Sequence, residues 1–297
     1  MGNGASQIME TRYSVLMSIY KKEKPMYFIQ SIESIVNQTL RPDEIVIVKD
    51  GELTIDLEKI IVQYTVDYPE LFTIVQLNEN VGLGRALDEG LKHCRNELVA
   101  RMDTDDISLK ERCEIQVRAF SDNPKLCIVG TMIDEFYNEP DNIVSSRVVP
   151  VTHGEILKFM KRRSPFNHPT VMFRKSEVIR CGGYGVMRRK QDLDLFSRML
   201  NNGCIAQNIN QSLLLFRSNE DNFKRRKSWS YCKSYMAVQL VIWKRGHCRI
   251  SDLVFVVTGQ LIIFLAPMWL LKEISNNYLR EKTLQAGDKN VIKTKIE

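Results

Sequence analysis

Apolar and polar positions along the first part of the chain follow two patterns, continuous apolar runs and runs with a helical period. Between the apolar runs, apolar positions recur with helical spacing, as in Phe28, Ile32 and Ile35. Strands that are apolar on both faces are typical of a parallel sheet covered by helices. We therefore predict an α/β fold with a Rossmann-like, mostly parallel, doubly wound sheet over about the first 105 residues. The predicted strands are 13–20, 44–49, 72–77 and 98–100.

The pattern is less regular between residues 107 and 218, where strands and helices no longer alternate strictly. A loop at 164–169 and a glycine-rich turn at 181–185 separate the later elements. The predicted strands here are 126–133, 144–149 and 170–173, and the predicted helices are 109–121, 153–160 and 191–200.

The last region, 221–297, differs in kind because residues 253–271 contain no charged side chain. Their length is at the lower limit for a spanning helix, and Pro267 and Gln260 would kink and weaken it. We therefore expect a helix or helical hairpin in the membrane interface, with Trp269 and flanking basic residues at headgroup level. The alternative is a core helix that packs on the rest of the protein.

Composition and charge narrow the class of protein. The chain of 297 residues has ordinary apolar and charged fractions and a net charge of +6. Its seven cysteines show no zinc-like spacing, and residues 1–10 do not resemble a signal peptide, so we expect reduced cytosolic thiols. Basic clusters suit phosphate or an anionic membrane face, but without interleaved aromatic residues they do not suggest nucleic-acid binding. These clusters are 161–163, 188–190, 224–227 and 244–245.

The chain's main candidate site is the segment Arg101–Asp106, in which three carboxylates follow a buried strand. Asp103, Asp105 and Asp106 supply hard oxygen ligands, which suit Mg²⁺ or Mn²⁺. The alternative is a solvated acidic turn before a helix, with Asp106 or Ser108 as the N-cap. Ligands of parallel sheets sit outside the carboxyl ends of the strands, and Asp50 ends another predicted strand. We therefore predict that Asp50 and the acidic segment share one crevice.

Two further positions carry candidate chemistry. Asp192 opens a helix after the glycine-rich turn, where a mobile loop can present a catalytic group, although an acid there also favours the helix dipole. His168 lies in the 164–169 loop, where it contacts a substrate or simply packs. Gly82 and Gly84 follow the third strand rather than the first, so neither a dinucleotide-binding fingerprint nor a P-loop is indicated.

Taken together, the motifs make the chain similar to family 2 glycosyltransferases of the GT-A fold. The resemblance is to the bacterial O-antigen and capsular polysaccharide branch, and within it to inverting β-1,3-glucosyl- and galactosyltransferases that act on lipid-linked GlcNAc or GalNAc. The matching segments are 13–18, 48–51, 78–84, 100–108, 166–174 and 182–184.

The resemblance implies a role for each matching residue. Asp50 would bind the uracil, Asp103 the ribose or metal-bound diphosphate, and Asp105 the Mn²⁺ or Mg²⁺. Asp192 would be the catalytic base, and Gln191 stands where the family usually has Glu. The remaining implied contacts are Arg101 and Gly82 to the nucleotide sugar, and His168, Asp106 and Gln191 to the acceptor, with Asp106 also supporting the metal site.

The implied reaction is transfer of a hexose, from UDP-Glc or UDP-Gal, to a sugar-diphosphoundecaprenol at the cytoplasmic face of the bacterial inner membrane. Residues 1–110 would form the nucleotide-sugar-binding half, 111–220 the acceptor-binding and catalytic half, and 221–297 the membrane-associating region. Two alternatives stay open. A nucleotidyltransferase should carry a glycine-rich phosphate loop where 21–25 stands, and a non-catalytic UDP-sugar-binding protein should have lost Asp105 or Asp192.

Overall fold

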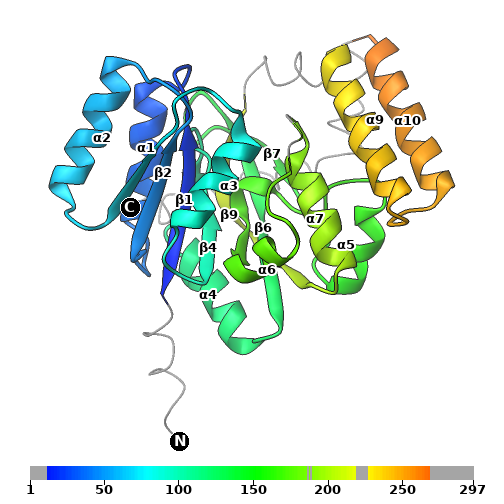
Figure 1. Ribbon diagram of the computed structural model, residues 1–297, viewed down its shortest axis with the longest axis horizontal. Helices are drawn as coiled ribbons and strands as arrows, with labels where there is room; N and C mark the ends of the chain where they lie inside the picture. The colour runs from blue at the N-terminus through cyan, green and yellow to red at the C-terminus, as the bar shows by residue number, and fades with distance from the viewer. Residues whose placement is uncertain (1–11, 186, 188, 219–226, 268–297) are drawn as a thin grey trace, which may run out of the picture.

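The computed structural model describes residues 12–185, 187, 189–218 and 227–267, in which a single mixed sheet forms the centre of the molecule (Figure 1). Its strand order is β3-β2-β1-β4-β8-β6-β9-β5, with β7 paired to β6. The strands are β1 Tyr13–Ile19, β2 Glu44–Lys49, β3 Phe72–Gln76, β4 Leu98–Arg101, β5 Ile107–Ser108, β6 Leu126–Tyr137, β7 Ile143–Arg147, β8 Met172–Arg174 and β9 Ile205–Ser218.

The first half of the sheet confirms the predicted parallel arrangement. Strands β3, β2, β1 and β4 are parallel to their neighbours, with Val15 opposite both Ile45 and Ala100. Both faces of β1 and β2 are covered, which is why their sequences are continuously apolar rather than alternating.

The second half departs from a simple parallel sheet. Strand β8 is antiparallel to both β4 and β6, and the long β9 runs parallel to β6. The pattern did not predict β9, because the polar residues at 207, 208, 210 and 211 interrupt its apolar positions. The predicted strand 170–173 is also shifted, since His168–Thr170 form a short 3₁₀ helix before β8.

Two layers of helices enclose the sheet, and the alternation of side chains along each strand serves both. Val15, Met17, Ile45 and Ile47 face α1, α2 and α4, whereas the intervening Leu16 faces α3 and the later helices. The predicted helix 109–121 begins three residues later, and α6 was not predicted. The helices are α1 Pro25–Val36, α2 Ile55–Asp67, α3 Leu83–His93, α4 Arg112–Asp122, α5 His153–Met160, α6 Lys175–Arg180, α7 Gln191–Asn201, α9 Trp229–Lys244 and α10 Ile250–Leu265.

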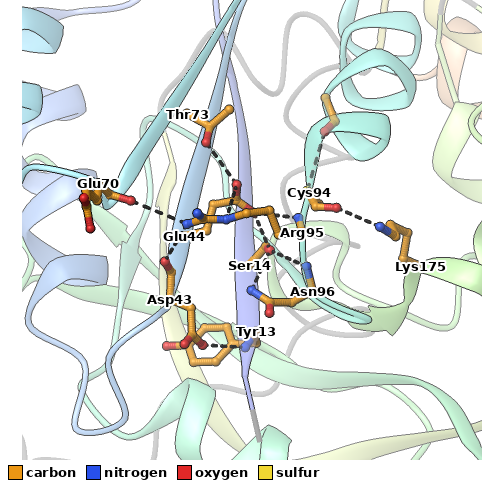
Figure 2. A network of polar contacts seen from close by, with 11 residues as sticks. Tyr13, Ser14, Asp43, Glu44, Glu70, Thr73, Cys94, Arg95, Asn96 and Lys175 are labelled. Atoms are coloured by element: carbon orange, nitrogen blue, oxygen red, sulfur yellow. Dashed lines mark hydrogen bonds and ion pairs between the residues drawn. The ribbon is translucent and has the colours of Figure 1, made fainter.

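A buried polar network ties together the amino ends of the parallel strands (Figure 2). Glu44 is fully buried at the start of β2, and its carboxylate accepts hydrogen bonds from Ser14 Oγ (2.7 Å) of β1 and Thr73 Oγ1 (3.0 Å) of β3. The amide of Arg95, just before β4, donates to the same carboxylate (2.8 Å), and its guanidinium pairs with it. One side chain therefore connects four neighbouring strands at the edge opposite the acidic segment.

The C-terminal helices α9 and α10 form a hairpin at one end of the molecule, opposite α2 (Figure 1). Among the described residues no helix is both long and apolar enough to span a membrane. The expected kink at Pro267 is wrong, because α10 ends at Leu265 and the proline lies beyond it. Trp269, Arg188 and the basic residues 224–226 lie outside the described residues.

Candidate active site

The structure places the two predicted acidic positions at the same edge of the sheet. Asp50 follows β2 and Asp103 follows β4, with β1 between these strands and parallel to both. The carboxyl ends of three neighbouring parallel strands therefore meet there, as expected for a ligand site in such a sheet.

Three carboxylates converge after β4. One oxygen each of Asp103, Asp105 and Asp106 lies within 4.8 Å of the others. Burial, together with the negative charges of Asp103 and Glu23, raises the pKa of Asp105 to about 7. Three carboxylates crowded in this way repel one another, so the arrangement favours a proton or a cation among them.

Asp106 is the innermost of the three and is fully buried. Its Oδ1 accepts a hydrogen bond from the Arg217 amide (2.9 Å), while its Oδ2 has no partner among the described residues. Burial, followed by the charges of Asp105 and Asp103, holds the pKa of Asp106 well above its ordinary value. This position suits a residue that supports a metal site, and the complete burial does not support a contact with the acceptor.

The donor set fits a hard divalent cation, since carboxylate oxygens are the ligands that Mg²⁺ and Mn²⁺ prefer. A second group of possible ligands, Cys127, Glu177 and Cys204, lies near the amino end of β9. There Arg180 already donates two hydrogen bonds to one oxygen of Glu177, so that carboxylate is neutralised. The acidic segment is therefore the better candidate for a metal.

Arg101 provides positive charge directly beside the carboxylates. It is 1% exposed at the end of β4, and its guanidinium pairs with Asp103. Within the part of the chain that the structure describes, its Nε and Nη1 atoms have no hydrogen-bond partner. Unpaired buried donors are costly, so this guanidinium is suited to an anionic ligand.

Asp50 holds the loop that follows β3. Its carboxylate accepts hydrogen bonds from the Val81 amide (2.7 Å), the Gly82 amide (3.1 Å) and the Asn80 side chain (3.0 Å). Burial raises its pKa, and the two amide hydrogen bonds oppose that shift. Gly82 is the N-cap of α3 and has a φ of 89°, a conformation that glycine adopts without strain. The loop is thus fixed against the end of β2.

Helix α7 carries the predicted base, Asp192, and a predicted acceptor contact, Gln191, at its start. Gln191 is its first residue, is 6% exposed, and packs so closely on Gly84 that a Cβ added there would lie 3.0 Å from Gln191 Cγ. Asp192 is the second residue of α7 and remains partly exposed. At that position it also interacts favourably with the helix dipole.

The Tyr184 hydroxyl is close enough to both Asp192 and the acidic segment for their charges to affect its pKa. Burial raises the pKa of its hydroxyl, Arg101 lowers it, and the charges of Asp192, Asp103 and Asp88 raise it. The hydroxyl therefore lies within range of both the predicted base and the predicted metal ligands. The Tyr184 amide donates to Asp88 Oδ1 (2.9 Å), which joins the glycine-rich turn to α3.

His168 lies in the same group of side chains. Its Nε2 is 3.0 Å from the Tyr184 hydroxyl. Burial lowers its pKa well below the ordinary value, Arg101 lowers it further, and Asp103 opposes the shift. The imidazole is therefore neutral near pH 7, so it can accept or donate a hydrogen bond without adding charge.

Sequence reasoning missed Arg217 at the end of β9. Its Nε donates to the Asp105 carbonyl (2.9 Å) and its Nη2 to Gln30 of α1 (2.6 Å), while its guanidinium stacks on Tyr27 at 3.8 Å. Its backbone amide also donates to Asp106, so Arg217 fixes the acidic turn through both its main chain and its side chain. The only signal was a single arginine after an apolar run, which does not indicate which loop it contacts.

Comparison with known proteins adds independent evidence. Residues 14–196 match the model of Glycosyl transferase family 2. The chain is 33% identical over 272 residues, covering 90% of it and 98% of the relative, to the UDP-Gal:alpha-D-GlcNAc-diphosphoundecaprenol beta-1,3-galactosyltransferase of Escherichia coli. It is 37% identical over 222 residues, 75% of the chain and 82% of the relative, to the amylovoran biosynthesis glycosyltransferase AmsE of Erwinia amylovora.

A solved structure shows the same fold. The mannosyltransferase PcManGT of Pyrobaculum calidifontis, in complex with GDP-Man and Mn²⁺, superposes with a TM-score of 0.61 at 14% identity, covering 96% of this chain and 80% of that one. The sheet order, the carboxylate cluster and the family match agree with one another. The chain belongs to glycosyl transferase family 2 and is a glycosyltransferase with a GT-A-like fold.

Proposed function

We propose that the protein transfers a hexose from a UDP-sugar, UDP-Gal or UDP-Glc, to a sugar-diphosphoundecaprenol, forming a β-1,3 linkage in O-antigen or capsule assembly. The observation that carries the proposal is the cluster of three carboxylates beside a buried arginine at the sheet edge. The β-1,3-galactosyltransferase relative, which aligns over nearly its whole length, supports the choice of donor and acceptor.

The donor half, residues 1–110, would bind the nucleotide. The Oδ1 atom of Asp50 accepts one hydrogen bond within the protein and retains a lone pair for the uracil N–H. Gly82 leaves open space beside the base, because a Cβ there would meet no atom within 4 Å. Arg101 would direct its unpaired nitrogens at the diphosphate.

Asp103 and Asp105 would hold Mn²⁺ or Mg²⁺, with Asp106 as a buried support. A bound divalent cation supplies Lewis acidity, which neutralises charge on the departing diphosphate. The close carboxylates and the unpaired Oδ2 of Asp106 fit such an ion. Arg101, the last residue of β4, contributes positive charge beside these carboxylates whether or not the ion is present.

Asp192 would act as the general base in the acceptor half, residues 111–220. A sugar hydroxyl is too weakly acidic to attack unaided, and a positioned carboxylate can take its proton as the new bond forms. One in-line displacement inverts the anomeric carbon, so an α-linked UDP-sugar gives a β-glycoside. His168 and Gln191, which lie near the base, would contact the acceptor.

The α9–α10 hairpin would rest on the cytoplasmic face of the inner membrane, where a lipid-linked acceptor is found. Helix α10 exposes apolar side chains to solvent, including Phe255 (60% exposed), Ile262 (55%) and Leu265 (76%). Arg162 stacks on Phe255 at 4.7 Å and brings positive charge to the edge of this surface. Apolar side chains flanked by basic residues favour an anionic interface.

A transfer assay tests the proposal. Purified protein with Mn²⁺ receives UDP-Gal, UDP-Glc, UDP-GalNAc or UDP-GlcNAc, each with a synthetic GlcNAc- or GalNAc-diphospholipid. We expect a β-linked disaccharide from one donor, and its loss with EDTA. In Asp192→Asn, transfer should fall about 10²–10⁴-fold while UDP binding persists, because only the base is removed. UDP-sugar binding without transfer from any pair would contradict the proposed reaction.

A further inference from the structure

The catalytic helix α7 contacts the C-terminal hairpin through one face. Residues 190, 194 and 197 follow an i, i+4, i+7 spacing, which places them on the same side of a helix. Asp192, two positions after Lys190, lies roughly opposite, because each residue turns the helix by about 100°. The pairs joining α7 to α9 and its following turn are Lys190–Tyr231, Asp194–Arg245 and Ser197–His247.

Lys190 makes the contact nearest the proposed base. It is the N-cap of α7 and has a left-handed backbone with a φ of 62°, which a residue other than glycine adopts only under strain. Its Nζ donates to the Tyr231 hydroxyl and lies over the rings of Tyr231 (4.3 Å) and Tyr235 (4.6 Å). Two aromatic side chains of α9 therefore hold the residue that sets the direction in which α7 begins.

Asp194 makes the second contact, one turn further along α7. Its carboxylate is 3% exposed and pairs with Arg198 (3.0 Å) on α7 and with Arg245 (2.5 Å) at the end of α9. Arg198 also donates to the Gly183 carbonyl (2.7 Å), so the same pair fixes the glycine-rich turn. The third contact on this face of α7 is made by the Ser197 hydroxyl, which lies 2.9 Å from His247 Nδ1.

We propose that Lys190 and Arg245 are positioning residues, through which the C-terminal hairpin fixes the start of α7 and thereby aims Asp192 at the reacting sugars. This inference rests on the proposed role of Asp192 as the base. The proposed nucleotide contacts come from other elements, β2, β4 and the loop before α3. Loosening α7 should therefore slow the chemical step and leave UDP binding intact.

Four variants of the full chain test the positions. Lys190→Gly accepts the left-handed backbone without strain but lacks the side chain that contacts the two tyrosines of α9. The relief of strain offsets the lost contacts, so the thermal midpoint should change little. Arg245→Met removes the partner of Asp194. We expect kcat to fall between about tenfold and a hundredfold in both, with an unchanged Kd for UDP and an unchanged acceptor KM. Lys190→Arg should restore most of the turnover, and the control variant Lys233→Met, at an exposed position on α9 outside the basic clusters, should match the wild type.

A double variant separates positioning through Asp192 from other effects. If Lys190 acts through the base, Lys190→Gly should have no further effect in the Asp192→Asn background. A kcat within twofold of the wild type in both Lys190→Gly and Arg245→Met would overturn the inference, as would a loss confined to the acceptor KM. Full turnover of Asp192→Asn alone would instead refute the base assignment, whatever the hairpin variants show.

Discussion

At the scale of single residues, the acidic segment is distinguished by how it is partnered. Asp103 pairs with Arg101, Asp106 is held by the Arg217 amide, and Asp105 stands between them with a pKa raised to about 7 by burial and by Asp103 and Glu23. Such crowding is unfavourable in an empty site and favourable around a cation. The sequence signal, three acids after a buried strand, was sufficient to identify these side chains.

Replacing Asp105 should remove metal-dependent turnover. In Asp105→Asn we expect kcat to fall by at least about 100-fold, because one charged ligand of the proposed cation site is lost. Initial rates measured over a Mn²⁺ titration check this. A comparable variant, Asp122→Asn at the far end of α4, should behave as the wild type, and full activity of Asp105→Asn would refute the metal assignment.

Metal binding should strengthen with pH across neutrality. Because the pKa of Asp105 is about 7 when folded and about 4 when unfolded, the metal-free folded state binds an extra proton between these values. Its stability therefore falls as pH rises from about 4 to about 7, and a cation that displaces the proton offsets this loss. The Mn²⁺-induced rise in melting temperature should be larger at pH 8 than at pH 6. Equal shifts would argue against Asp105 as a ligand.

At the scale of elements, the two ends of the parallel strands differ in role: one end carries the candidate site and the other a buried polar network. The carboxyl ends carry Asp50 and the acidic segment, whereas the amino ends are joined by the buried carboxylate of Glu44 (Figure 2). The first strands and helices were predicted well because both faces of each strand are buried and one face of each helix is buried. This gives continuous apolar runs for the strands and helical spacing of apolar residues for the helices. Strand β9 was not predicted, since its pairing with β6 outweighs the polar residues at 207, 208, 210 and 211.

The Glu44 network should contribute to stability without affecting chemistry. Glu44→Leu leaves the buried Ser14 hydroxyl and the Arg95 amide without their acceptor, so the free energy of unfolding should fall by about 1–3 kcal/mol. Urea denaturation measures the change. Glu89→Leu, which removes a carboxylate paired with Lys92 at the surface, should change it by less than about 1 kcal/mol. An equal effect of the two variants would show that the buried network adds nothing.

At the scale of the whole molecule, the hairpin α9–α10 has one surface packed on the protein and one exposed to solvent. On one side, α9 and the turn after it contact α7. On the other, α10 presents exposed apolar residues at the end of the molecule away from α2 (Figure 1). The sequence indicated a helix or hairpin with interfacial character, and it also left open that this region packs on the core. The structure shows the packing on the core, since α9 buries Val238 and Ile242 in the main core, and the interfacial role stays a prediction.

Charge on the outer side of α10 should release the protein from membranes. In the variant Ile262→Glu with Leu265→Glu, co-sedimentation with anionic vesicles should fall at least about tenfold, because two exposed apolar side chains no longer enter the interface. Val66→Glu on α2, also an exposed apolar position, is the matched control and should sediment as the wild type. Unchanged binding of the α10 variant would contradict the interfacial role.

Local pattern was enough for the alternating strands and helices of the first half, the acids at their carboxyl ends and the family resemblance, because each depends on neighbours in sequence. The tertiary structure alone decided that β8 and β9 complete the sheet, that Arg217 holds the acidic turn, and that Lys190 and Asp194 meet α9. These contacts join residues far apart in the chain. Their free energy comes from pairing and burial that exist only once the fold has formed, so no periodicity in the sequence reports them.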